Sequence, residues 1–278
     1  ETRYTKNTYT LDTGTFAFEG EGDFDDTLPR LAVSYDMNNN WNFYANYAKG
    51  RRSPVVNADA SGVTVTKAEI VDSYDLGVKY QSPNFTFTGA VFTYQYSDYQ
   101  QSYTDAETLQ SITVTVGDST MSGIEGMATY HYSDTLSFTT SLGFLDAEFA
   151  DDTADGTPFQ YGGNKFRLAP EVSGAININK LVEMDNWLLD FNWLTSFQSK
   201  VYFESSNYPG LWQDTHSLTD VSMKVSKDNS QFAFEVYVDN LFDKEYLIDA
   251  GNTGGGLGIP TFVRGMPRIA GVRVYYDF

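Results

Sequence analysis

The sequence predicts an all-β fold, namely an antiparallel, up-and-down transmembrane β-barrel. Three observations lead to this prediction. Apolar and polar residues alternate with a period of two, the alternating segments are long, and the connections between them are short and long in turn. These patterns predict about twelve strands.

The alternation is clearest near residues 186–203 and 230–242. In the first segment one face carries Trp187, Leu189, Phe191, Trp193 and Phe197. In the second segment the apolar residues Phe232, Phe234, Val236 and Val238 alternate with Ala233, Glu235, Tyr237 and Asp239. A charged side chain that faces lipid is destabilising, whereas one that faces a wet lumen costs little. We therefore expect the apolar row to face lipid and the row with Glu235 to face water.

The predicted strands are long. They lie near residues 1–10, 28–37, 40–50, 66–80, 84–100, 110–132, 134–149, 165–179, 186–203, 213–227, 230–242 and 261–278. Strands of soluble proteins most often have about five or six residues, whereas a tilted strand needs about 9–11 residues to cross the hydrocarbon of a membrane. The lengths therefore favour membrane-spanning strands.

The connections alternate strictly in length. The short ones lie near 37–40, 81–84, 132–134, 180–186 and 227–230. The long ones lie near 11–27, 51–65, 97–109, 150–164, 204–212 and 243–260. Outer-membrane barrels have short periplasmic turns and long extracellular loops, while Greek-key sandwiches mix the two. This order predicts that all short turns face the periplasm.

The composition excludes several classes of function. The 278 residues carry 37 acidic and 18 basic side chains, a net charge of −19, so nucleic acid is not an expected partner. Cysteine is absent, which excludes disulfides, thiolate catalysis and cysteine-ligated metals. No apolar run is long enough for a transmembrane helix, and the first ten residues do not form a signal peptide.

No catalytic, metal or cofactor site is expected. A Ser–His–acid arrangement at His216 would indicate a hydrolase, but "QDTHSL" has no strained nucleophile turn. The glycine-rich stretch 251–258 precedes no helix that could bind phosphate. The stretch "DDTADG" at 151–156 lacks the spacing and the final Glu of a calcium loop. We expect both stretches to be outer loops.

Several stretches resemble the barrel of TonB-dependent outer-membrane receptors. "VDNLFDKEY" (Val238–Tyr246) resembles the signature of that family's penultimate strand, and "RGMPRIAGVRVYYDF" (Arg264–Phe278) resembles its last strand. Further similar stretches follow in the family's order at 28–54, 72–80, 122–149 and 164–176. The resemblance covers essentially the whole chain.

The resemblance implies a particular piece of a larger protein. Residues 1–278 would be the C-terminal part of a barrel of about 22 strands, open because its other strands are missing, with the plug domain and the N-terminal energy-coupling segment absent. The protein would import a scarce large ligand across the bacterial outer membrane, by family default an iron–siderophore complex. TonB would supply energy through the missing N-terminal region. A stand-alone passive pore of about twelve strands is the alternative, and an outer-membrane hydrolase is a third.

Seven residues in or beside the predicted outer loops are candidates for ligand binding. They are Arg51, Arg52, Tyr99, Tyr103, Tyr208, Trp212 and Arg264. Arginine pairs well with carboxylates, and aromatic rings supply stacking surfaces. The competing role for the arginines is contact with lipopolysaccharide phosphates or ion pairs within loops. The competing role for Tyr99 and Trp212 is an interfacial aromatic girdle.

Three further expectations concern the ends of the strands. Trp41, Tyr80 and Trp187 lie beside short turns and should form the periplasmic aromatic girdle, opposite Tyr99 and Trp212. Residues 1–10 and 261–278 should be the two edges of an open sheet, each facing an absent neighbour. In the last strand Val272, Val274, Tyr276 and Phe278 share one face. This row resembles the signal that the barrel-assembly machinery reads, which would recognise an exposed strand edge by β-augmentation.

Overall fold

The computed structural model describes residues 2–12, 17–59, 62–104, 111–150, 161–251 and 261–277. Every regular element in these ranges is a β-strand. The same ranges contain no helix that could span a membrane.

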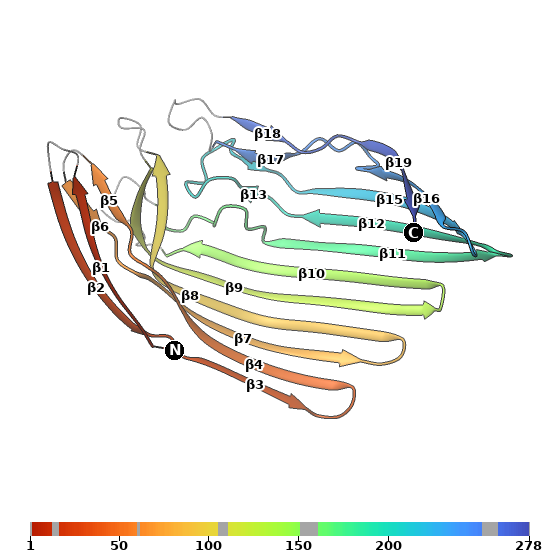
Figure 1. Cartoon of the computed structure of the whole chain (residues 1–278), viewed down its shortest axis with the longest axis horizontal. Helices are drawn as coiled ribbons and strands as arrows, with labels where there is room; N and C mark the ends of the chain where they lie inside the picture. The colour runs from red at the N-terminus through yellow and green to blue at the C-terminus, as the bar shows by residue number, and fades with distance from the viewer. Residues whose placement is uncertain are drawn as a thin grey trace.

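One large antiparallel sheet forms the body of the protein (Figure 1). Its eleven strands, from one edge to the other, are β3 (Arg30–Asp36), β4 (Trp41–Arg52), β7 (Glu69–Gln81), β8 (Phe85–Thr104), β9 (Ser111–Ser133), β10 (Leu136–Phe149), β11 (Val172–Met184), β12 (Trp187–Gln198), β15 (His216–Lys227), β16 (Phe232–Asp239) and β19 (Ile269–Tyr276). Each strand pairs with its neighbours in the order of the chain, so the sheet is an up-and-down meander. The prediction of an all-β, antiparallel, up-and-down architecture is confirmed.

The sheet is open. β3 and β19 stand at its two edges, and in the described residues each pairs on one side only. This confirms the expectation of an open partial barrel. The predicted edge at residues 1–10 is wrong, because β1 (Thr2–Asp12) pairs with β2 (Ala17–Thr27) in a separate hairpin. The acidic residues of 17–27 indicated a loop, but backbone hydrogen bonds can form a hairpin without an apolar side-chain pattern.

The two ends of the sheet differ. All short turns lie at one end and the long connections at the other, as Figure 1 shows. The turn predicted at 180–186 is shorter than expected: β11 runs to Met184, and only Asp185 and Asn186 connect it to β12. Asp185 has a positive φ of 53°, which a tight hairpin turn requires and which Asp tolerates better than most residues.

The long connections contain small hairpins that the sequence did not predict, although β13 and β18 fall within the strands predicted at 186–203 and 261–278. Small hairpins are formed by β5 (Val56–Asp59) with β6 (Gly62–Val65), β13 (Val201–Tyr202) with β14 (Trp212–Gln213), and β17 (Leu247–Ala250) with β18 (Phe262–Arg264). The strand predicted to begin at 165 begins instead at Val172. Residues 165–168 form only single bridges, from Lys165 to Glu148 and from Arg167 to Tyr202. We call the hairpins and residues 161–168 the outer layer.

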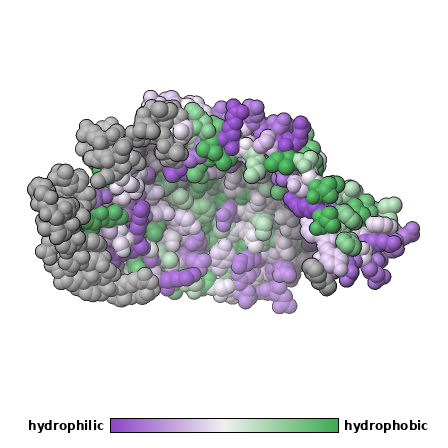
Figure 2. All heavy atoms as spheres, turned by 45° about the horizontal axis from the view of Figure 1, so that its top comes forward, coloured by the Kyte–Doolittle hydropathy of each residue, from purple (hydrophilic) through white to green (hydrophobic). Residues whose placement is uncertain are grey.

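The main sheet has an apolar face that lies open. An unbroken row of cross-strand partners is formed by Val33, Ala45, Leu76, Val91, Ile124 and Phe144, all of them exposed. Phe234 and Val236 lie in a similar row with Val274 and Val272. Such a face suits lipid rather than water. In the space-filling view of Figure 2 the middle of the molecule is hollowed and carries hydrophobic and hydrophilic residues intermixed.

The opposite face of the sheet is polar. Asp190, Lys224, Glu235 and Arg273 are successive cross-strand partners on β12, β15, β16 and β19. Arg273 donates to Glu235 at 3.0 Å, and the Tyr275 hydroxyl donates to the same carboxylate at 2.6 Å. The carboxylate of Glu235 therefore lies on this polar face, where its charge is paired with that of Arg273.

The motif "VDNLFDKEY" has a structural role. Asn240 is buried with a φ of 50°. Its side-chain amide donates to the carbonyls of Lys244 and Met266 at 2.9 and 3.1 Å and accepts from the Lys244 amide at 2.8 Å. These bonds turn the chain from β16 into β17 and tie it to the segment before β19.

The aromatic residues predicted for the periplasmic girdle lie at the short-turn end. Trp41 and Tyr80 are cross-strand partners with ring centroids 4.6 Å apart, and Trp187 opposes Lys227. Tyr99 and Trp212 lie towards the opposite end, so the predicted separation of the two groups is confirmed. In the last strand Val272, Val274 and Tyr276 form an exposed row, whereas Phe278 lies outside the described residues.

Candidate ligand-binding surface at the outer end

A β-bulge bends the longest hairpin. The register of β8 with β9 shifts between Tyr96 and Gln100, and Asp98 has a positive φ of 54°. An extra residue in one strand bends it and re-aims its side chains. Because about 9–11 residues suffice to cross the hydrocarbon, the part of β8 beyond the bulge lies outside the membrane. Figure 1 shows this outer part turning away from the direction of the strand below it.

An aromatic cluster lies directly beside the bulge. Its buried members are Val116, Ala147, Phe149, Tyr161 and Phe166. The ring of Tyr99 lies 5.3 Å from that of Phe166 and 5.6 Å from that of Phe149, centroid to centroid. Burial raises the pKa of the Tyr99 phenol, and Glu69 raises it further, so the hydroxyl stays protonated and can donate a hydrogen bond. Tyr99 thus belongs to a small core and not to a lipid-facing girdle.

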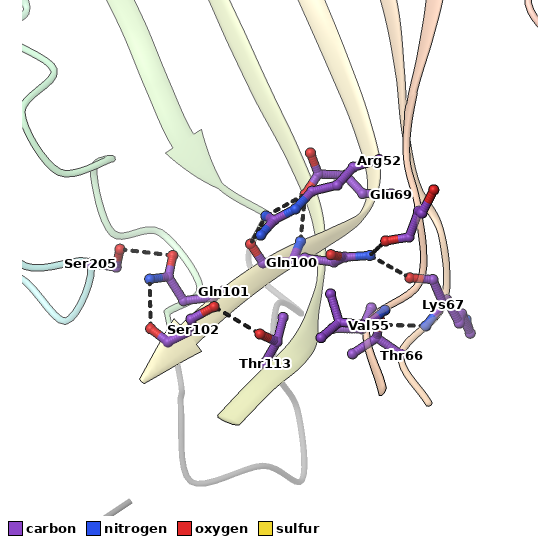
Figure 3. Close-up of polar contacts among 12 residues, drawn as sticks. Arg52, Val55, Thr66, Lys67, Glu69, Gln100, Gln101, Ser102, Thr113 and Ser205 are labelled. Carbon is purple, nitrogen blue, oxygen red and sulfur yellow. Dashed lines mark hydrogen bonds and ion pairs between the residues drawn. The ribbon is translucent and has the colours of Figure 1, made fainter. Parts of the chain in front are cut away.

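A polar network centred on Gln100 connects three strands (Figure 3). Gln100 is 2% exposed. Its backbone amide donates to Glu69 at 2.7 Å, and its side-chain amide donates to the carbonyls of Ser53 and Lys67 at 3.1 and 2.8 Å. Arg52 donates to the Gln100 carbonyl at 3.2 Å, and the same nitrogen lies 3.8 Å from Glu69. The side chain of Arg52 is half exposed, so its guanidinium has further donors for a ligand.

Side chains also tie the small hairpins to the sheet. The Asn57 amide donates to the Thr113 carbonyl at 2.6 Å and accepts from the Thr113 amide at 2.9 Å. This pair of bonds docks β5 onto β9 as a neighbouring strand would. The Ser205 hydroxyl, in the connection between β13 and β14, donates to Gln101 in the outer part of β8 at 3.3 Å. The outer ends of strands far apart in the chain are therefore held as one layer.

Lys165 anchors residues 161–168 to the sheet. Its ammonium lies 2.7 Å from Asp146 and 3.3 Å from both Glu148 and Glu171. The hydrogen bond to Asp146 is the main cause of the raised pKa of Lys165, which therefore stays charged at neutral pH. These acidic residues are paired within the protein.

A second buried cluster lies under β13 and β14. It comprises Val201, Phe203 and Ala250, with Leu211 and Leu247 packed against it. Arg167 donates to the Phe203 carbonyl at 3.1 Å. Burial raises the pKa of the nearby Glu204 carboxyl; the charge of Arg167 opposes this shift and that of Asp249 adds to it.

Lys200 is held by two aromatic rings above this cluster. Its ammonium lies 3.9 Å from the centre of the Trp212 ring and 4.4 Å from that of Tyr202, and it donates to the Tyr202 hydroxyl at 3.1 Å. Cation–π contacts of this kind hold the ammonium in place while leaving its other donors available.

The structure brings some of the predicted binding residues together and separates others. Arg52 and Tyr99 adjoin the same network through Glu69 and Gln100. Arg51 alternates with Arg52 along β4 and so points to the opposite face. Three more residues lie elsewhere in the outer layer, namely Trp212 beside Lys200, Tyr208 at 64% exposure, and Arg264 on β18 opposite Leu247. The side chain of Tyr103 lies outside the described part of the chain.

Sequence reasoning missed Gln100, Glu69, Phe149, Phe166 and Arg167. The spacing of Tyr94 and Tyr96 in "YQYSDYQ" places both on one face of a strand, but simple alternation does not extend to Tyr99 because the bulge at Asp98 adds a residue. Segment 164–168 follows no period, so its contacts could not be predicted.

The remaining candidate sites in the sequence are His216 and the stretches 151–156 and 251–258. His216 stacks on Tyr246 with centroids 5.1 Å apart, and its Nδ1 lies 3.3 Å from the Asp214 carbonyl. Neither contact is the nucleophile contact of a hydrolase. Stretch 151–156 and residues 252–258 of the glycine-rich stretch lie outside the described residues.

Comparison with known proteins agrees with this architecture. The family model "TonB dependent receptor-like, beta-barrel" matches residues 2–241. The chain is similar to the pesticin receptor of Yersinia pestis, with 23% identity over 269 residues that cover 95% of this chain and 38% of the receptor.

Two solved structures have a similar fold. The ferric yersiniabactin uptake receptor of Yersinia pestis superposes with a TM-score of 0.79 at 23% identity, covering 95% of this chain and 39% of that one. The ferric preacinetobactin receptor of Acinetobacter baumannii gives a TM-score of 0.71 at 19% identity, covering 94% of this chain and 38% of that one. The present chain therefore spans about two-fifths of the length of these relatives.

Proposed function

This chain belongs to the TonB-dependent receptor β-barrel family of the bacterial outer membrane, and on that premise we propose that it is part of an active transporter that imports a scarce, large ligand. The proposed ligand is a ferric siderophore complex. Two of the similar structures are named for ferric yersiniabactin and ferric preacinetobactin, the first as an uptake receptor, and another is named a siderophore receptor. Residues 1–278 would be the C-terminal part of the barrel domain.

One observation carries the proposal: the outer end of the sheet presents Arg52 and Tyr99 on a rigid support. Gln100 and Glu69 fix the guanidinium, and the aromatic cluster fixes the Tyr99 ring. A ligand that bears carboxylate or other anionic oxygens would accept hydrogen bonds from the guanidinium. Rigid support lowers the entropy lost when such a ligand binds.

Further partners are proposed from the surfaces that suit them. The exposed apolar rows suit membrane lipid, and Arg264 suits lipopolysaccharide phosphates. The row Val272, Val274 and Tyr276, with Phe278, would be recognised by the barrel-assembly machinery. TonB would act through a region outside residues 1–278. A stand-alone pore is less well supported, because the sheet does not close on itself in the described residues.

Uptake of ⁵⁵Fe by iron-starved cells tests the proposal. Cells with the full-length protein should take up a panel of ferric siderophores only when TonB is present. A passive pore would give uptake without TonB. Loss of a charge-assisted hydrogen bond of about 1.5–3 kcal/mol predicts that Arg52→Ala weakens binding about tenfold to a hundredfold. Arg51→Ala is the matched control, and an equal effect of both variants would contradict the assignment.

A further inference from the structure

A separate pocket lies where the outer layer meets the C-terminal strands. Its volume is about 280 Å³. The ends of β12 and β15 form one wall, and β13 and β17 form the other. It shares no residue with the polar network around Gln100.

Three polar side chains converge on this pocket from one face of the sheet. Ser196 and Gln198 alternate along β12, and Gln198 is the cross-strand partner of His216 on β15. In the described part of the chain the Ser196 hydroxyl and the Gln198 amide have no hydrogen-bond partner. The carbonyl of Asp214 can only accept, so the 3.3 Å contact requires the proton on Nδ1 of His216. Nε2 is then an acceptor, again without a partner among the described residues.

The lining of the pocket is uncharged. None of its twelve lining residues is Asp, Glu, Lys or Arg, although 55 such residues occur in the chain. The rest of the wall is mostly apolar, with Val201, Phe203 and Leu218 among its members. A charged group would lose its hydration here without gaining an opposite charge. The pocket therefore selects an uncharged ligand.

The aromatic residues in the lining of the pocket favour a ring as the ligand. The imidazole of His216 stacks on Tyr246 with planes 22° apart, so the polar side of the pocket is itself a flat aromatic surface. A buried apolar cavity of about 150 Å³ holds benzene, and this pocket is larger. We propose that it is a second binding site, specific for an uncharged aromatic ring with a hydroxyl group, whose O–H donates to Nε2 of His216.

The two histidines of the chain allow a direct test. His131 is exposed beside the short turn at the opposite end, so it serves as an internal control. The full-length protein in detergent is labelled with ¹³C at histidine Cε1, and the signals of His131 and His216 are assigned as those lost in His131→Asn and in His216→Asn. Phenol, benzene and benzoate are then titrated separately.

We expect phenol to shift the His216 signal saturably in about the millimolar range and to leave His131 unchanged. Benzene should bind about tenfold more weakly, because it offers no donor to Nε2. Benzoate should not bind. Equal shifts at both histidines, benzoate binding as tight as that of phenol, or no saturable shift would each overturn the proposal.

Two variants distinguish the pocket from a general effect on folding. Leu218→Phe fills the pocket from β15 and should abolish the phenol shift. Ile248→Phe narrows it from an exposed position on β17, so it keeps the test valid if the first variant fails to fold. Ser217→Ala, on the opposite face, should bind phenol normally. Phenol binding that survived in a folded pocket-filling variant would contradict the assignment. None of these outcomes depends on iron uptake.

Discussion

The main sheet, which forms the wall of the barrel, and the outer layer are stabilised by different interactions. In the wall the apolar side chains are exposed, and β3 buries none of its residues. Among the residues whose burial the structure describes, the eight buried hydrophobic ones all lie at the outer end instead. The wall depends on backbone pairing and on lipid to cover its apolar face, whereas the outer layer carries two small cores of its own. Rigid side-chain placement for binding therefore belongs to the outer end.

The largest expected effect separates two phenylalanines of the same strand. Phe149 is 2% exposed in the aromatic cluster, and Phe144 is 51% exposed on the lipid-facing row of β10. Phe149→Ala should destabilise the outer layer by about 3–5 kcal/mol, seen as faster hydrogen exchange in 161–168. Phe144→Ala should change that exchange little, because detergent covers the site in both forms. Similar exchange in the two variants would refute the distinction between the regions.

A glycine of the wall provides the next test. Gly77 on β7 lies beneath the Tyr44 ring, and a Cβ atom there would overlap the ring. Gly77→Ala should lower the free energy of unfolding by about 1–3 kcal/mol, measured by urea titration in detergent. Gly143→Ala is the control, since its Cβ would lie 3.4 Å from the Ser173 hydroxyl. If both variants were equally stable, the packing of Tyr44 on Gly77 would not contribute to the free energy of unfolding.

The third test uses pH. Because burial raises the pKa of Glu204, the folded outer layer binds this proton more tightly than the unfolded chain does. The stability of β13–β14 should therefore rise as the pH falls from neutral through the raised pKa, and level off below the ordinary value near 4.5. Hydrogen exchange, corrected for its intrinsic pH dependence, measures this. Glu204→Gln should remove the trend, and Glu183→Gln at the short-turn end should not; a trend that persists in Glu204→Gln would assign it to another group.

The smallest expected effect concerns Lys200. Lys200→Met should destabilise the β13–β14 hairpin by about 1 kcal/mol or less and change the fluorescence of Trp212. The difference spectrum against Trp212→Phe isolates that signal. Lys227 lies over Trp187 at the other end, 5.5 Å from the ring centre, so Lys227→Met should leave the Trp212 signal unchanged. An unaltered Trp212 spectrum in Lys200→Met would show that the contact does not persist in solution.

The sequence predicted the wall far better than the outer layer. Alternation in segments such as Phe232–Val238 reports directly on which face meets lipid, because the period of a strand is two. The outer layer depends on features without a period: the bulge at Asp98, the buried amide of Gln100 and the single bridges of Lys165 and Arg167. Arg52 and Tyr99 were predicted individually from position and chemistry. Their shared network could not be predicted, because Glu69 and Gln100 belong to strands whose register only the structure gives.

The proposed orientation places the outer layer outside the cell and the short turns in the periplasm, and cysteine labelling of whole cells distinguishes the two ends. The chain contains no native cysteine, so each introduced cysteine reports alone within it. Tyr208→Cys places a thiol in the outer layer, and Asn39→Cys places one in the turn between β3 and β4. A membrane-impermeant maleimide should label Tyr208→Cys in intact cells and Asn39→Cys only after the outer membrane is permeabilised. Labelling of Asn39→Cys in intact cells, with Tyr208→Cys protected, would show that the orientation in the membrane is the reverse.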